Sequence, residues 1–252
     1  MKLNVESFTS DMDLSADKKI RSFYSYKLVL IAFDINKTIL YAHKKTKLLN
    51  LNLEKNLENV KSNEHIEGYD IYYRNGRPEL LDFLFVENAQ LFDIGVWSSL
   101  DKDYTGHFAK SYFGRYYRNL QFVIACKRET YEGVLRQTSV EPLQIHRDFK
   151  QLQEKFQDQY TNNNIIMISN YPNLTDSYTP NDIILSKYDP IQIGNIFGND
   201  LEITTLIKYL RGLKVFVTVK NVEDVRPVIQ AKSFKQTYNR ILNNQRNYNE
   251  IN

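Results

Sequence analysis

The ten residues Leu30 to Ile39, LIAFDINKTI, decide the fold that the sequence predicts. An unbroken apolar run from Leu28 to Phe33 indicates a strand that is buried on both faces. The run ends abruptly in three polar residues, Asp34, Asn36 and Thr38. In an open α/β sheet, residues just past the carboxyl ends of the strands line the ligand site, so Asp34 has the position of a nucleophile or metal ligand. The alternative is an Asp that caps a strand-to-helix turn, and this stretch alone favours neither.

The rest of the chain alternates predicted strands with predicted helices. Further strands are expected at Tyr69–Tyr73, Phe92–Trp97, Leu120–Ala125, Ile165–Ile168 and Ile183–Leu185, and helices at Pro78–Leu91, Asp101–Phe113, Arg147–Tyr160 and Asp200–Leu213, the last ended by Gly212. This alternation predicts a three-layer α/β domain with a mostly parallel sheet. The stretch from Tyr41 to Asn63 is expected to form a short helix or a small flap.

Three segments follow from this pattern. Residues 25–230 are expected to form the α/β domain. Residues 1–24 are a polar lead-in, and residues 231–252 a basic, Asn-rich helix or tail with apolar residues at helical spacing.

Polar residues also follow two other predicted strands. Ser98 and Ser99 come after the second buried strand, and Ser169 and Asn170 after the fourth. Because parallel strands end at the same edge of a sheet, we expect these residues and Asp34 to share one site.

Composition narrows the functional classes. The formal charge of +3, from 33 basic and 30 acidic residues, demands neither nucleic acid nor an anionic membrane as partner. Cys126 is the only cysteine, so an internal disulfide is excluded, and a reducing compartment is expected. No stretch approaches the roughly 20 apolar residues of a membrane helix. The first residues lack the apolar core of a secretory signal.

The order of these motifs resembles that of the haloacid-dehalogenase-like phosphatases. The closest likeness is to the branch of RNA polymerase C-terminal-domain phosphatases, NLI-interacting factors (small nuclear-envelope phosphatases) and the mitochondrial import subunit Tim50. DINKT, at Asp34 to Thr38, is similar to the first motif of that branch, Asp-x-Asp-x-Thr/Val, with one change. The segments RNGRPELLDFL, DIGVWSS, IHRDF and IIMISN stand at the places of its later motifs. NVEDVRPVI, at Asn221 to Ile229, is similar to the closing motif of Tim50.

The resemblance implies a mechanism in which an Asp attacks phosphorus beside a magnesium ion and a second Asp protonates the leaving oxygen. Asp34 then corresponds to the nucleophile, Thr38 completes the first motif, and Ser98 corresponds to the phosphoryl ligand. Asn36 replaces the general acid, and an amide cannot supply that proton, which is worth about 10²–10⁴ in rate. Arg147 replaces the phosphate-binding Lys, with a planar fork in place of a compact ammonium.

The expected metal site is also altered. Ser169 and Asn170 stand where the resemblance implies a carboxylate ligand. Magnesium prefers carboxylate oxygen, so Asp34, Ser169 and Asn170 would make a weak or empty site. Asp176 or Asp182, further along the chain, could supply a displaced carboxylate.

These observations lead to three hypotheses. The first is a catalytically impaired phosphatase-like module, a pseudophosphatase without a cofactor, that serves as a binding or structural subunit of a larger protein assembly. The likeness to Tim50 implies an intracellular, soluble or peripheral protein in the mitochondrion. The second is a magnesium-dependent phosphoserine or phosphothreonine protein phosphatase with Asp34 as nucleophile. The third is a protein that binds RNA through SYFGRYYRNL, Ser111 to Leu120, although such a run is more often a helix end with a half-buried aromatic face.

Overall fold

The computed structural model describes residues 29–44, 60–126, 149–156, 159–171, 181–190, 200–220 and 223–251. The predicted lead-in, most of the stretch between Tyr41 and Asn63, and the start of the helix predicted from Arg147 lie outside these ranges.

A five-stranded parallel sheet forms the centre of the fold, in the order β6-β5-β1-β7-β8. Its strands are β1 (Val29–Phe33), β5 (Phe92–Asp101), β6 (Val123–Cys126), β7 (Ile165–Ser169) and β8 (Asp182–Ile184). The first strand of this sheet along the chain, β1, is its central strand, with β5 on one side and β7 on the other. The predicted α/β class with a mostly parallel sheet is therefore confirmed.

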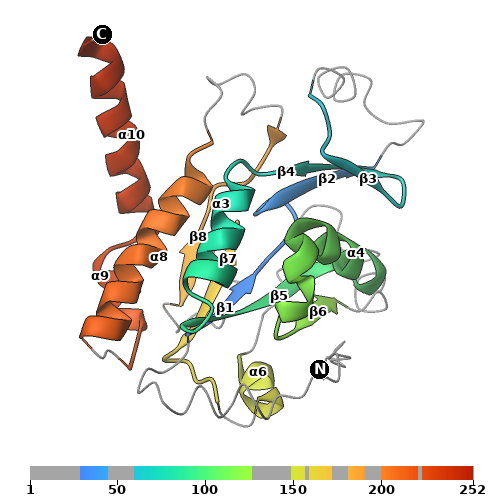
Figure 1. The fold of residues 1–252 in the computed structure, drawn as a ribbon, viewed down its shortest axis with the longest axis horizontal. Coiled ribbons are helices and arrows are strands. Elements are labelled where there is room, and N and C mark those ends of the chain that lie inside the picture. The colour runs from blue at the N-terminus through green and yellow to red at the C-terminus, as the bar shows by residue number, and fades with distance from the viewer. Residues whose placement is uncertain are drawn as a thin grey trace, which may run out of the picture.

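Side chains of β1 alternate between two hydrophobic cores because successive residues of a strand point to opposite faces. Val29, Ile31 and Phe33 belong to the larger core, whereas Leu30 and Ala32 belong to the smaller one. Helices α3 (Arg77–Asp82), α4 (Lys102–Phe113) and α8 (Glu202–Val219) contribute to the larger core, and α6 (Lys150–Lys155) to the smaller. The fold thus has the three predicted layers (Figure 1).

The flap is a separate antiparallel sheet of three strands in the order β2-β4-β3. Its strands are β2 (Leu40–Lys44), β3 (Glu64–Ile66) and β4 (Tyr69–Tyr73). It lies beyond the end of the central sheet (Figure 1). β2 begins at Leu40, two positions after Thr38, so the flap starts directly at the predicted site.

Two predicted element ends are wrong. The strand predicted to stop at Ser98 continues to Asp101, because after a register shift β5 pairs again with Cys126 of β6. The helix predicted over Asp200–Leu213, with Gly212 as its stop signal, continues to Val219. Beyond Gly212 it buries Leu213 and Val217 in the core, which outweighs the roughly 1 kcal/mol cost of an internal glycine.

Two other helices differ from their predicted lengths. The helix expected over Pro78–Leu91 is α3 followed by a π-helical turn, Phe83–Glu87. Within the C-terminal stretch, α9 (Arg226–Ala231) precedes α10 (Phe234–Ile251), so the predicted helix or tail is a helix. Phe234 packs against Tyr209 of α8 with a centroid distance of 5.9 Å, Thr237 and Tyr238 also face the core, and the C-terminal part of α10 extends away from the body (Figure 1). In the described ranges no helix combines the length and apolar character needed to cross a membrane.

Candidate functional site

Asp34 lies directly at the end of β1, where the parallel pairing continues into the loop. Its backbone N–H donates to the Ile168 carbonyl of β7 at 2.9 Å. Its Oδ1 accepts a hydrogen bond from the Ile35 N–H at 2.8 Å, and only 1% of the residue is exposed. The local sequence explains this position, since the apolar run buries β1 and leaves the first polar residue at the sheet edge.

The ends of β1 and β7 are joined by side chains. The Thr38 hydroxyl donates to Asn170 Oδ1 at 3.0 Å, and both residues are buried. Ser169, the last residue of β7, donates its hydroxyl to the Tyr171 carbonyl at 2.8 Å. The structure thus places Asp34, Thr38, Ser169 and Asn170 at one edge of the sheet.

Ser98 reaches the same edge from the other side of β1. β5 pairs with β1 in the register Phe33 to Val96, which places Ser98 alongside the loop that follows Phe33. The side chain of Ser98 is buried, and its Oγ accepts a hydrogen bond from the Leu100 N–H at 3.1 Å.

Asn36 is turned toward the flap. Its Oδ1 accepts from the Ala42 N–H of β2 at 3.5 Å, and its backbone forms an isolated bridge with Leu40. Asn36 therefore supports the start of the flap. Arg147 lies outside the described residues, as does Asp176.

Among the described residues, the donor set at this edge is poor in the carboxylates that magnesium prefers. Of Asp34, Ser169 and Asn170, Asp34 alone is a carboxylate, and the Ser169 hydroxyl already donates to a carbonyl. Asn170 has its Oδ1 in the hydrogen bond with Thr38, and its buried Nδ2 has no partner in the described structure. A neutral amide oxygen can ligate a hard cation but adds no negative charge, so it binds magnesium less strongly than the expected carboxylate would. Among the described residues, no group of three or more His, Cys, Asp or Glu side chains could hold a metal ion.

Asp182 does not replace the missing carboxylate at the edge. It opens β8 beside Met167 of β7, two positions before the strand end at Ser169. Residues aligned in this way share a face of the sheet, and Met167 belongs to the smaller core, on the side of α6. Asp182 therefore lies back from the edge at which Asp34 sits.

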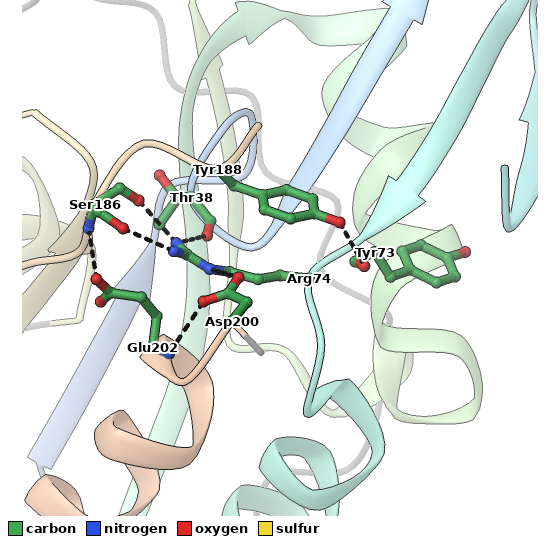
Figure 2. A network of polar contacts seen from close by, with 7 residues as sticks. All are labelled: Thr38, Tyr73, Arg74, Ser186, Tyr188, Asp200 and Glu202. Atoms are coloured by element: carbon green, nitrogen blue, oxygen red, sulfur yellow. Dashed lines mark hydrogen bonds and ion pairs between the residues drawn. The ribbon is translucent and has the colours of Figure 1, made fainter. Parts of the chain in front are cut away.

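Arg74, the first residue of the RNGRPELLDFL segment, organises the loops behind the site (Figure 2). It is 1% exposed, and its Nε donates to Asp200 Oδ2 at 2.6 Å. Its Nη1 donates to the Thr38 carbonyl at 2.9 Å and to the Ser186 carbonyl at 2.8 Å, and its Nη2 donates to Ser186 Oγ at 3.0 Å. One guanidinium thus joins the loop after β1, the loop after β8 and the start of α8.

Glu202 completes the network from the first turn of α8. Its Oε1 accepts from the Ser186 N–H at 3.3 Å, and its backbone N–H donates to Asp200 Oδ1 at 3.1 Å (Figure 2). Its Oε2 is buried and has no partner in the described structure. Burial raises the pKa of Glu202, and the positive charge of Arg74 opposes the rise. Arg74 therefore pairs directly with Asp200, while the buried carboxylate of Glu202 joins the same network through Ser186.

Sequence patterns gave no signal for this network. Arg74 follows a strand and precedes Asn75-Gly76, and Asp200 and Glu202 look like ordinary acids at a helix start. Segments 126 and 112 residues away in the chain supply the partners of Arg74, so only the tertiary fold joins them.

The Tyr/Arg run considered for RNA binding contributes to the core. Tyr112 and Phe113 are buried, and Tyr116 stacks on Phe85 with a centroid distance of 4.9 Å. Arg115 and Arg118 remain exposed on the 3-10 helix Gly114–Asn119. This placement agrees with a helix end that has a half-buried aromatic face.

Two of the solved structures to which this chain is similar are structures of Fcp1. The structure of Fcp1, an essential RNA polymerase II CTD phosphatase, aligns at 15% identity and a TM-score of 0.42, over 70% of this chain and 46% of the other. A fission yeast Fcp1 variant bound to beryllium fluoride aligns at 13% identity and a TM-score of 0.43, over 92% and 60%. This chain therefore spans about half of those proteins. No protein-family profile and no curated protein matches the sequence.

Proposed function

We propose that this chain is a phosphatase-like module with an impaired catalytic site, and that it serves as a binding or structural subunit of a larger protein assembly. The observation that supports this most directly is the hydrogen bond between Thr38 and Asn170. In this bond, the neutral and buried amide of Asn170 stands at the position where a metal-binding carboxylate is expected.

Two further features support the proposal. Asn36, at the position of the expected general acid, has no proton to give at neutral pH, and its carbonyl oxygen supports Ala42 of the flap. The C-terminal helix α10 carries Lys235 and Arg240, both exposed, and extends away from the body as an arm that a neighbouring subunit can bind (Figure 1). The mitochondrial setting belongs to the proposal through the likeness to Tim50 alone.

The second candidate is a magnesium-dependent phosphoserine or phosphothreonine phosphatase. It is favoured by the retained Asp34 at the carboxyl end of the central strand, with Ser98 alongside. It requires a carboxylate from a segment outside the described residues.

Hydrolysis assays separate the two. Purified protein is incubated with an aryl phosphate and with a phosphoserine peptide, with magnesium and with chelator, beside Asp34→Asn as a matched control. We expect equal, background rates for both proteins. Magnesium-dependent turnover that Asp34→Asn abolishes would establish the enzyme and reject the impaired site.

The structural role is tested separately by purification from the native source. A complex of fixed stoichiometry that resists nuclease supports a subunit role. A monomer, or an association lost on RNase treatment, contradicts it.

A further inference from the structure

Lys37, in the loop after β1, has an unusual backbone conformation with φ of 59°. Left-handed backbone of this kind is uncommon for a residue with a side chain and costs free energy. The conformation is held by two hydrogen bonds. The Lys37 N–H donates to the Leu40 carbonyl at 2.7 Å, and the Lys37 carbonyl accepts from the Tyr188 N–H at 2.7 Å.

These bonds bring a second lysine beside the first. Lys187 precedes Tyr188 in the loop after β8, which is anchored on both sides of it. Arg74 donates to the Ser186 carbonyl at 2.8 Å, and the Tyr188 hydroxyl donates to the Tyr73 carbonyl at 3.0 Å (Figure 2). Lys187 is therefore presented at a fixed place near the site loop, with its side chain exposed.

The ammonium group of Lys37 has little electrostatic compensation from the described residues. Lys37 is half-buried, and its ammonium makes no hydrogen bond or ion pair with any described residue; its aromatic neighbour is the Tyr41 ring, 5.9 Å from Nζ to the centroid. Burial lowers the pKa of Lys37, the charge of Lys187 lowers it further, and the charge of Asp189 opposes both. A ligand with negative charge would relieve this repulsion.

The neighbouring flap surface suits a peptide better than a small ion. Tyr41 and His43 lie on one side of β2 and stack with a centroid distance of 6.4 Å. Among the described strands, β2 is an edge strand of the flap sheet, and an extended peptide can lie along such a strand. The Lys37 ammonium and the Tyr41 ring thus lie side by side, at the start of β2 next to the loop that follows β1.

We infer that Lys37 and Lys187, with the Tyr41 ring beside Lys37, form a binding site for an extended, Asp/Glu-rich segment of a partner protein. The inference rests on the proposed function, because it names the chemistry of the partner that the impaired site would hold.

Peptide binding by the full chain tests it. Labelled Glu-rich, Gln-rich and Lys-rich peptides of equal length are titrated by fluorescence anisotropy, beside a phosphoserine peptide of the Gln-rich sequence. We expect the Glu-rich peptide to bind more tightly than the Gln-rich one, with affinity falling as salt is added. Lys37→Gln and Lys187→Gln should each weaken it roughly fivefold, and the double variant by at least tenfold. The control double variant Lys208→Gln, Lys220→Gln removes two exposed lysines, one within α8 and one just after its end, and should bind normally.

Each other result overturns the inference. Equal affinity for the Glu-rich and Gln-rich peptides, or loss of binding in the control variant, would show that these lysines form no acidic-peptide site. Binding of the phosphoserine peptide alone, displaced by inorganic phosphate, would assign the lysines to a phosphomonoester. Hydrolysis is measured separately with Asp34→Asn, so a failure of the proposed function does not appear as a failure of peptide binding.

Discussion

The Thr38 hydroxyl and the Asn170 side-chain oxygen lie 3.0 Å apart, although 132 positions separate the two residues in the chain. This hydrogen bond closes the edge of the sheet between the ends of β1 and β7. Both residues are buried, so water does not take the place of either partner.

A double-mutant cycle measures this bond. Thr38→Val removes the donor with little change in shape, and Asn170→Ala removes the acceptor. We expect each single variant to lower the free energy of unfolding by about 1–3 kcal/mol, and the cycle to give a coupling of about 0.5–1.5 kcal/mol in urea unfolding. Strictly additive losses would mean that the two side chains do not interact in solution.

The ion pair of Arg74 with Asp200 should be far more important than an exposed pair. Arg74→Met leaves Asp200 buried without its partner and is expected to cost about 3–5 kcal/mol. The control Arg211→Met breaks the pair with Glu87, whose side chains are 57% and 51% exposed, and is expected to cost less than about 1 kcal/mol. Equal losses would contradict the network. If Arg74→Met does not fold, Asp200→Asn offers a milder test of the same pair.

Glu202 should make stability depend on pH. Burial raises its pKa in the folded protein above the ordinary 4.5, so the folded protein holds this proton more tightly than the unfolded chain does. The resulting stabilisation is complete below the unfolded pKa and is lost as the pH rises through the folded pKa. The free energy of unfolding therefore declines as the pH rises from weakly acidic to neutral, and Glu202→Gln should remove the part of this decline that Glu202 causes. Urea unfolding at several pH values measures it. An unchanged pH profile in Glu202→Gln would disprove the assignment.

Gly95 should tolerate no side chain. A Cβ at this position of β5 would lie 2.3 Å from the Phe122 ring. Gly95→Ala is expected to cost about 1–3 kcal/mol in thermal or urea unfolding, and Phe122→Leu in the same chain should restore part of the loss. Gly106→Ala in α4 is the control, because a Cβ there meets nothing within 4 Å. It should be neutral or stabilising by up to about 1 kcal/mol.

Much of the fold could be predicted because it depends on local patterns. The apolar run Val29–Phe33 predicts a central strand, because a strand with an unbroken apolar sequence is typical of a parallel sheet that is covered on both faces. Alternating strand and helix patterns then predict a parallel sheet, and polar residues after strand ends predict the edge where Asp34 lies. Gly212 shows the limit of this reasoning, because tertiary burial of Leu213 and Val217 outweighs a local helix-ending signal.

The sequence by itself determined which residues reach the edge of the sheet: Asp34, Ser98, Ser169 and Asn170 each come directly after, or close after, a predicted buried strand of a parallel sheet. Only the tertiary structure decided how they are used. The bond between Thr38 and Asn170, and the burial of Arg74 among three loops, depend on contacts between segments far apart in the chain. The physical reason is that strand and helix periodicity is set by neighbours along the backbone, whereas the partner of a buried polar group is set by whichever segment the completed core places within hydrogen-bond distance.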